Sequence, residues 1–158
     1  MSESANSRHP LITAKEIAAL PESVNVHRLN SNAIRHARSL GDAVGMTTIG
    51  IHLVRVAPGN ATTEFHFHHQ DEEWVYILSG RGIAEIGEEC FEVGAGDFMG
   101  FVMKSLPHAM RNSFDTDLVY LVGGARCPFD VCDYPRIGKR RYHVNGVNEF
   151  VEIDKLCR

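Results

Sequence analysis

Three histidines and four acidic residues lie close together in the segment EFHFHHQDEE, residues 64–73. His66 and His68 are two residues apart, so on a β-strand both side chains point to the same face, about 6.5–7 Å apart along the strand. Two imidazoles in this arrangement can bind one metal ion. Four residues then lead to Glu73, which opens the apolar segment WVYILS. An antiparallel strand beginning there would bring a carboxylate back beside the histidines.

A third histidine, His108, follows Pro107 much later in the chain and opens another β-rich segment. Three histidines and one glutamate make a nitrogen and oxygen site, which suits Fe, Mn, Ni, Cu or Zn as a divalent ion. Such a site can leave one or two coordination positions open for water or substrate. Without an ion, burying these side chains in a β-barrel would be costly. The set predicts one divalent metal ion of unspecified identity.

The segments around these residues have the alternating apolar pattern and the glycine-containing turns of short β-strands. No helical period separates them, which disfavours a parallel α/β fold. The pattern predicts an all-β protein, an antiparallel sandwich or barrel. The predicted strands lie within residues 47–57, 74–79, 83–86, 90–93, 97–103, 108–113 and 117–124.

The two ends of the chain differ from this central region. Residues 1–10 are expected to be disordered, and Thr13 to Glu16 form a capping box that predicts a short helix ending at Pro21. Residues 24–36 have a mixed pattern that can hold an irregular strand. From Ala125 onward, we expect an ordered arm that packs on the barrel and ends in a strand. The predicted division is an N-terminal extension (1–44), a barrel (45–124) and a C-terminal arm (125–158).

Composition narrows the classes of partner and compartment. The 158 residues carry a net charge of −4, which gives no support for a nucleic-acid or membrane partner. The basic residues of the arm are interpreted as a solvated face, with phosphate contact as the alternative: Arg136, Lys139, Arg140 and Arg141. The polar start of the chain predicts a cytoplasmic protein. The four cysteines are expected to be free thiols, with a Cys127–Cys132 bridge as the alternative.

Two motifs in the chain resemble those of the cupin superfamily. The first runs from Gly59 through His66-Phe-His68-x4-Glu73 to Gly80, with one extra residue before His66. The second runs from Gly96-Asp97 to Pro107-His108-x3-Asn112, and the tail DVCDYP resembles that of an uncharacterised group of single-domain bacterial cupins. The resemblance implies a double-stranded β-helix, or jelly-roll, barrel that is often dimeric. It also implies that the metal ligands are His66, His68, Glu73 and His108.

Some assignments have alternatives. Strand alternation allows only one of Glu72 and Glu73 to face inward, and Glu73 keeps the motif's distance to Gly80. His69 could replace His68 only if the strand ended early. The second motif lacks its usual Pro-x-Gly, so Lys104 could lie at the mouth of the barrel, although a solvent-facing side chain is favoured. The remaining histidines are interpreted as ordinary core or surface residues: His9, His27, His36, His52 and His143.

These observations favour a metal-dependent enzyme that acts on a small oxygen-rich molecule, as a dioxygenase, isomerase or lyase. The alternatives are a non-catalytic small-molecule-binding or sensory module, and a purely structural metal site. Catalytic residues stay unassigned, because no spacing distinguishes the candidate bases Tyr76, Tyr120, His52 and Glu64. A homodimer is expected, since the chain's ends can cover an exposed sheet edge.

Overall fold

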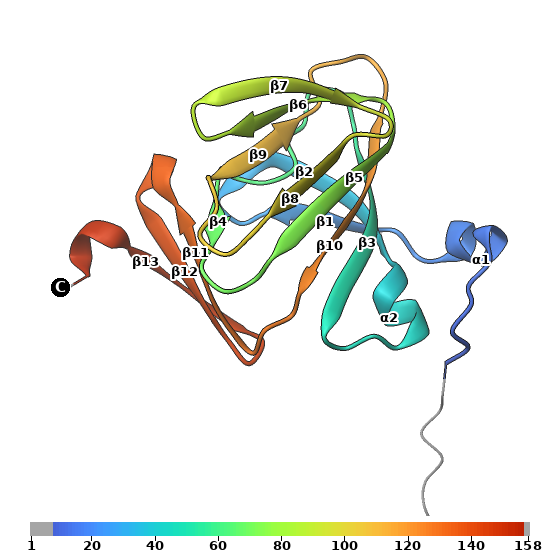
Figure 1. Cartoon of the computed structure of the whole chain (residues 1–158), viewed down its shortest axis with the longest axis horizontal. Helices are drawn as coiled ribbons and strands as arrows, with labels where there is room; N and C mark the ends of the chain where they lie inside the picture. Colours follow the sequence, from blue (N-terminus) through green and yellow to red (C-terminus); the bar gives the residue numbers. More distant parts are fainter. Residues whose placement is uncertain (1–7, 157–158) are drawn as a thin grey trace, which may run out of the picture.

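The strands form three sheets in this computed structural model, which describes residues 8–156 (Figure 1). Every ladder between the strands is antiparallel. The sheet orders are β1-β2-β3-β10-β5-β8, β7-β6-β9 and β13-β12-β11-β4. The strands are β1 (Ser23–His27), β2 (Asn30–Ser39), β3 (Ile49–Val56), β4 (Phe67–His68), β5 (Glu73–Ser79), β6 (Arg81–Ile86), β7 (Glu89–Gly94), β8 (Phe98–Phe101), β9 (His108–Arg111), β10 (Leu118–Ala125), β11 (Phe129–Tyr134), β12 (Lys139–Val144) and β13 (Val147–Glu152).

The central strands confirm the all-β prediction. Each predicted segment between residues 47 and 124 overlaps one strand of the structure. Among the strands from β3 to β10, only the short β4 was not predicted as a separate strand. Their inward-facing residues pack between the six-stranded and three-stranded sheets. The most buried members include Val54, Val56, Ile77 and Leu118, which expose 2% or less of their surface. This core stabilises the barrel by apolar burial, and its Phe101 ring stacks on His108.

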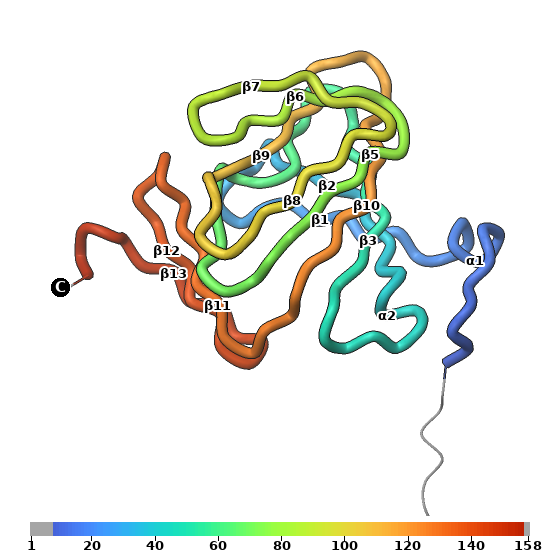
Figure 2. The backbone as a smooth tube through the Cα atoms, in the orientation of Figure 1, coloured from blue at the N-terminus to red at the C-terminus, as the bar shows by residue number. Residues whose placement is uncertain are grey.

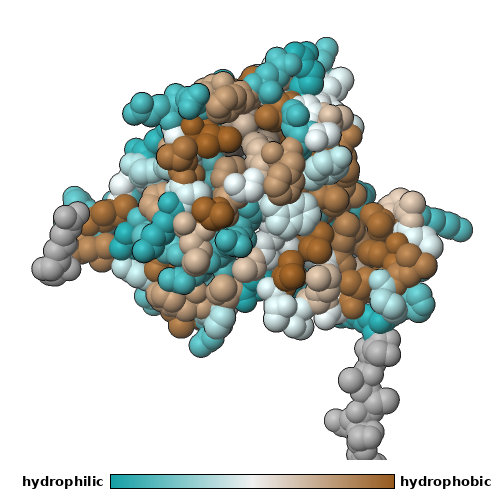
Figure 3. Space-filling view, viewed as in Figure 1, coloured by the Kyte–Doolittle hydropathy of each residue, from teal (hydrophilic) through white to brown (hydrophobic). Residues whose placement is uncertain are grey.

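Helices are short and lie at the ends of strands: α1 (Ala14–Ala19), α2 (Leu40–Val44), η1 (Pro135–Ile137) and η2 (Ile153–Lys155). The predicted capping box is confirmed, because the Thr13 hydroxyl accepts from the Glu16 N–H and the Thr13 N–H donates to the Glu16 carboxylate. Within residues 8–156, no helix has the length and apolar character to span a membrane. Figure 3 shows apolar side chains gathered on the visible face around α1 and α2, a region whose exposed residues include Leu11, Met46 and Ile49.

Residues 23–39 form a hairpin rather than one irregular strand. Strand β2 pairs with β3 and so joins the six-stranded sheet of the barrel. Sequence pattern alone did not reveal this pairing, because the polar segment depends on contacts with β3 for its structure. Of the N-terminal residues expected to be disordered, 1–7 lie outside the described part of the chain.

The C-terminal arm forms the hairpins β11–β12 and β12–β13. Strand β11 pairs with β4, with Cys132 opposite His68 and Asp133 opposite Phe67. Figure 2 shows this arm and α1 at opposite ends of the longest axis. Among the described cysteines, Cys90, Cys127 and Cys132 are free thiols, as expected. The pairing with β4 brings the arm directly against the histidine-rich segment.

Candidate metal centre

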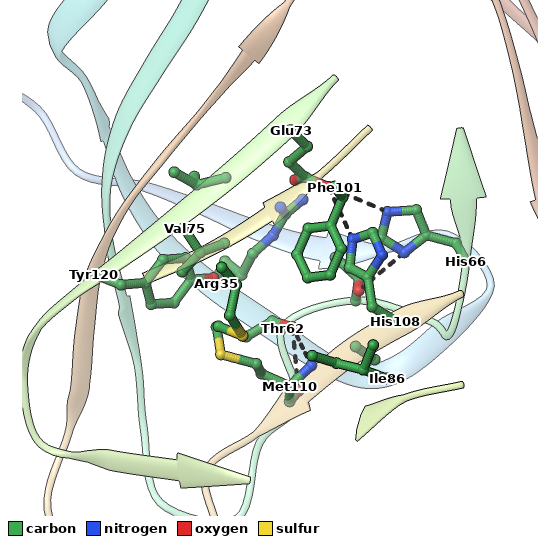
Figure 4. A pocket seen from close by; sticks show the side chains of 14 residues that line it. Arg35, Thr62, His66, Glu73, Val75, Ile86, Phe101, His108, Met110 and Tyr120 are labelled. Carbon is green, nitrogen blue, oxygen red and sulfur yellow. Dashed lines mark hydrogen bonds and ion pairs between the residues drawn. The ribbon is translucent and has the colours of Figure 1, made fainter. Parts of the chain in front are cut away.

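Three different sheets contribute to one polar cluster at the end of the barrel (Figure 4). His66 precedes β4 and forms an antiparallel bridge with His108, the first residue of β9. The two backbones exchange N–H···O bonds of 3.1 and 2.8 Å. Glu73 is the first residue of β5, so its carboxylate reaches the bridged histidines from the facing sheet.

The Glu73 carboxylate lies at the centre of the cluster. Its Oε2 atom is 3.1 Å from His108 Nε2, 3.6 Å from His66 Nε2 and 3.9 Å from His68 Nε2. An ion bound at about 2.1 Å from each ligand would hold neighbouring ligand atoms about 3.0–3.4 Å apart. Ligand atoms of His66, Glu73 and His108 lie within 4.8 Å of one another. His68 contacts this group through its Nε2 atom, which faces the Glu73 carboxylate. His66, Glu73 and His108 are therefore close enough to share one ion, and His68 lies beside the same carboxylate.

The other ring nitrogen of each histidine faces an oxygen acceptor. His66 Nδ1 is 2.9 Å from the Glu64 carbonyl oxygen, and His68 Nδ1 is 2.7 Å from Asp130 Oδ2. His108 Nδ1 is 3.4 Å from the Leu106 carbonyl oxygen. With an ion bound, these acceptors would hold the proton on Nδ1 and leave the Nε2 lone pair free to bind the metal beside the Glu73 carboxylate. Without an ion, an Nε2–H can instead donate to Glu73. The set of three imidazoles and one carboxylate fits a divalent metal ion.

The protonation states within the cluster also suit metal binding. Burial lowers the pKa of His66 more than the Glu73 carboxylate raises it, so this imidazole stays neutral. Burial opposes ionisation of Glu73, but hydrogen bonds to His108 and His66 keep the pKa of Glu73 well below its usual range. The cluster thus presents an ionised carboxylate beside a neutral imidazole, the forms in which these side chains bind metals.

Asp130 of the C-terminal arm supports His68 from behind. Its Oδ1 atom accepts from the backbone N–H groups of Gln70 and Asp71 at 3.0 and 3.2 Å, and its side chain is fully buried. Burial opposes ionisation, yet the bond to His68 and these N–H groups lower the pKa of Asp130 to about 2. For His68, burial lowers the pKa but is outweighed by the Asp130 bond and nearby carboxylates, so the net shift is upward. Asp130 therefore holds the His68 ring through a charge-assisted hydrogen bond.

Other potential ligands lie close to the cluster. Cys132 approaches His66 and His68, and Asp71 and Asp130 approach His68. Burial raises the pKa of the Cys132 thiol to about 12, so this sulfur keeps its proton and is a poor ligand. Asp71 Oδ1 accepts from the Cys127 N–H at 3.1 Å. These contacts favour the glutamate-centred set over the groups that include Cys132 or Asp71.

The cluster borders two connected spaces. The inner cavity has a volume of about 30 Å³, roughly that of one water molecule in the liquid. A larger pocket of about 210 Å³ lies at the mouth of the barrel, lined by residues that include His52, Glu72 and Arg126. Arg35, Glu73 and Val122 line both spaces. The mouth pocket is the larger of the two spaces beside the cluster and offers more room for a substrate body.

The remaining candidates from the sequence lie in different places. Tyr120 lines the inner cavity and His52 the mouth pocket, whereas Tyr76 is 40% exposed. The Glu64 carboxylate accepts a 3.0 Å hydrogen bond from the Asn30 amide. His69 Nε2 contacts Asp133 at 3.0 Å instead of joining the cluster.

The structure also locates Glu72, the alternative to Glu73, and Lys104, which could have lain at the mouth of the barrel. Glu72 is exposed and lines the mouth pocket, whereas Glu73 lies between the histidines. Lys104 is exposed and has a positive φ of 55°, in the turn after β8. Its backbone N–H donates to the His68 carbonyl oxygen at 2.8 Å, so this turn holds β4 in place.

Sequence reasoning missed two charged residues at the site, Arg35 and Asp130. Arg35 lies on β2, whose pairing with β3 was not predicted. Asp130 is 62 residues from His68, and the two meet only because β11 pairs with β4. The tail motif DVCDYP contains Asp130, but nothing in its pattern identifies the histidine that it contacts.

A family model described as a cupin domain matches residues 52–124. A protein of Acidithiobacillus ferrooxidans, provisionally called a sugar phosphate isomerase, has a similar crystal structure. It is 40% identical, with a TM-score of 0.93, over 97% of this chain and 98% of its own. A sugar phosphate isomerase from a cupin superfamily, from Silicibacter pomeroyi, is 26% identical, with a TM-score of 0.77, over 86% and 88% of the two chains.

Curated proteins match over shorter stretches. The oxalate decarboxylase of Arthroderma benhamiae is 39% identical over 80 residues, which are 47% of this chain and 18% of that protein. An uncharacterised protein of Methanocaldococcus jannaschii is 31% identical over 80 residues, which are 51% of this chain and 56% of that protein. The chain thus spans about half of one curated relative and about a fifth of the other.

Proposed function

The chain belongs to the cupin superfamily, and from this premise we propose that it is a divalent-metal-dependent isomerase of a small phosphorylated sugar. The observation that carries the proposal is the convergence of His66, His108 and His68 on the Glu73 carboxylate beside an open mouth pocket. Cupins commonly bind a metal, and this donor set suits Fe, Mn, Ni, Cu or Zn. The full-length similarity to the two proteins called sugar phosphate isomerases supports the choice of reaction.

Isomerisation needs a polarised carbonyl group and a base that moves a proton between neighbouring carbons. The bound ion would supply the Lewis acid that polarises a substrate carbonyl oxygen. Among the candidate bases, His52 lies in the mouth pocket, where burial and nearby Arg126 lower its pKa. A neutral imidazole can accept a proton at neutral pH. We therefore assign His52 the role of the base.

Tyr120 suits a different role. It lines the inner cavity and is 2% exposed, and burial raises the pKa of its hydroxyl far above the usual value. The hydroxyl therefore keeps its proton at any physiological pH. In this proposal Tyr120 donates a hydrogen bond to a substrate or water oxygen and does not act as a base.

A second candidate reaction is decarboxylation of a small dicarboxylate. The match to an oxalate decarboxylase favours it, although that match covers 18% of the decarboxylase. Both candidates use a metal beside an anionic, oxygen-rich substrate. They differ in their products and in the need for a proton-transferring base.

Proton NMR separates the candidates. Metal-loaded protein is incubated with a panel of aldose and ketose phosphates in D₂O and, separately, with oxalate in H₂O, because the hydrogen of formate comes from the solvent. Isomerisation would give a new sugar phosphate and, where the transferred proton exchanges with solvent, deuterium beside the carbonyl, whereas decarboxylation of oxalate would give formate. The isomerase proposal expects turnover of a sugar phosphate that disappears in Glu73→Ala and in His52→Gln. Formate production alone would favour the decarboxylase, and ligand-induced stabilisation without any product would favour a binding module.

A further inference from the structure

Arg35 is a cation without a carboxylate partner in the part of the chain that the structure describes. Its side chain lines both the inner cavity and the mouth pocket, and Figure 4 shows it extending toward Glu73. Other arginines nearby are paired: Arg38 lies 3.0 Å from Glu22, and Arg126 lies 2.7 Å from Asp42. Arg35 is thus distinguished by its position and by its free guanidinium group.

Strand alternation fixes this orientation. Ala33 is fully buried and Ala37 packs against the apolar core, so Arg35 between them faces the barrel interior. His36 and Arg38, on the opposite face of β2, both contact Glu22. The guanidinium group therefore cannot turn to the outer carboxylates without breaking the register between β2 and β3.

The local charge favours an anion at this position. A divalent ion outweighs the single Glu73 carboxylate, and the Arg35 guanidinium adds a further positive charge to the same space. Two positive centres in a partly buried cavity repel each other unless an anion lies between them. The mouth carboxylates do not meet this need, because Asp71 is bonded to the Cys127 N–H and Glu72 points to solvent at the rim.

We infer that Arg35 binds an oxyanion group of the substrate, a phosphate monoester or a carboxylate, at the junction of the mouth pocket and the metal centre. This inference rests on the proposed metal-dependent function, but it does not depend on the choice between isomerisation and decarboxylation. The planar guanidinium presents paired N–H donors that match two oxygens of either group. The mouth pocket of about 210 Å³ is much larger than the inner cavity of about 30 Å³ and gives the anion more room.

Calorimetric titration tests this binding site with protein that contains its metal and no excess ion. The probes are inorganic phosphate, oxalate and neutral glucose, at constant ionic strength. We expect one oxyanion to bind the wild-type protein and glucose to bind far more weakly. Arg35→Gln should weaken oxyanion binding roughly 10- to 100-fold, the usual effect of losing a charge-assisted hydrogen bond. The stronger of the phosphate and oxalate signals identifies the class of substrate anion.

Two further variants control the experiment. Arg38→Gln removes an arginine of the same strand that points outward to Glu22, and it should bind the oxyanion as the wild type does. Arg35→Lys keeps the charge without the paired donors and should recover part of the affinity. Metal content and thermal unfolding are measured for every variant, so that loss of fold or metal is recognised.

Equal oxyanion affinity in folded, metal-loaded wild type and Arg35→Gln would overturn the inference, as would the absence of any oxyanion binding to the wild type. A failure of the proposed function can be distinguished from a failure of the inference about Arg35. Oxyanion binding that depends on Arg35 but leads to no product would refute the enzyme and leave the binding site standing. Turnover with an unchanged kcat/KM in Arg35→Gln would refute the role of Arg35 and leave the enzyme standing.

Discussion

Replacing Asp130 by asparagine tests how the C-terminal arm contributes to metal binding. In the wild type, Asp130 Oδ2 accepts from His68 Nδ1 at 2.7 Å, while Oδ1 accepts from the backbone N–H groups of Gln70 and Asp71. An asparagine that keeps both backbone bonds must place its amide nitrogen against His68. The amide N–H then favours a lone pair on Nδ1 and a proton on Nε2, the nitrogen that faces Glu73.

The expected loss follows from this change of tautomer. A protonated Nε2 cannot bind a metal, so His68 would have to rotate or exchange its proton before acting as a ligand. Loss of such a carboxylate–histidine contact commonly weakens metal affinity about 10- to 100-fold, which corresponds to about 1.4–2.7 kcal/mol. We expect Asp130→Asn to fall in this range.

Asp133→Asn is the matched control. Asp133 lies on the same strand and also contacts a histidine, because its Oδ2 atom is 3.0 Å from His69 Nε2. His69, however, lies outside the proposed ligand set. Competition with a chromophoric chelator gives the metal affinity of each variant, and nitrogen-15 NMR of the histidine rings gives the tautomer. The reasoning is refuted if Asp130→Asn binds metal as tightly as wild type, or if Asp133→Asn weakens binding equally.

Four other predictions follow from the structure. His108→Ala should lower the metal content measured by elemental mass spectrometry. The barrel should stay folded by circular dichroism, because most of the apolar burial between the two sheets remains. Unchanged metal content would exclude His108 as a ligand. Chelation of the metal should likewise leave the far-ultraviolet spectrum unchanged, whereas loss of the β signal would indicate a structural ion. The folded pKa of Asp130, about 2, lies below its ordinary value of 3.8, so its contribution to stability is present above about pH 4 and is lost as the pH falls toward 2. Denaturant titrations of metal-free protein should show this acid dependence reduced in Asp130→Asn, and identical slopes would contradict it. The homodimer was expected from the covering of a sheet edge, and the structure adds another candidate surface, the apolar outer face formed by Trp74, Tyr76 and Phe98. Phe98 is 63% exposed there, so Phe98→Asp should give a monomer by sedimentation if this face is the interface. A monomeric wild type would refute this.

The sequence predicted the parts of the fold that depend on local pattern. The capping box at Thr13 and the strands between Ile49 and Ala125 follow from contacts between near neighbours and from alternating burial. The hairpin β1–β2 was not predicted because its residues are mostly polar and gain their order from pairing with β3. Of the three strands of the arm, only the last was expected, and β11 and β12 were missed because prolines and charges obscure their alternation.

The candidate site likewise combines residues that the local sequence pattern identifies and residues that only long-range strand pairing brings together. His66 and His68 are two residues apart, so strand alternation alone points both side chains to one face. Glu73 was expected to return on a paired antiparallel strand, but β5 lies in a different sheet from β4 and brings the carboxylate across the barrel. His108 was proposed from its residue type, and its bridge to His66 depends on distant parts of the chain. Arg35 could not be predicted, because its inward orientation depends on the register of a strand that the sequence pattern did not reveal.

The most direct test is the metal content of untagged protein purified without chelators, compared with that of Glu73→Ala. Glu73 is the side chain that all three histidines face, so its loss should affect binding more than any change at the rim. The account predicts about one divalent ion per chain in the wild type and a large loss in the folded variant. Equal metal content in the two proteins, or a wild type that binds no divalent ion even after reconstitution, would contradict it.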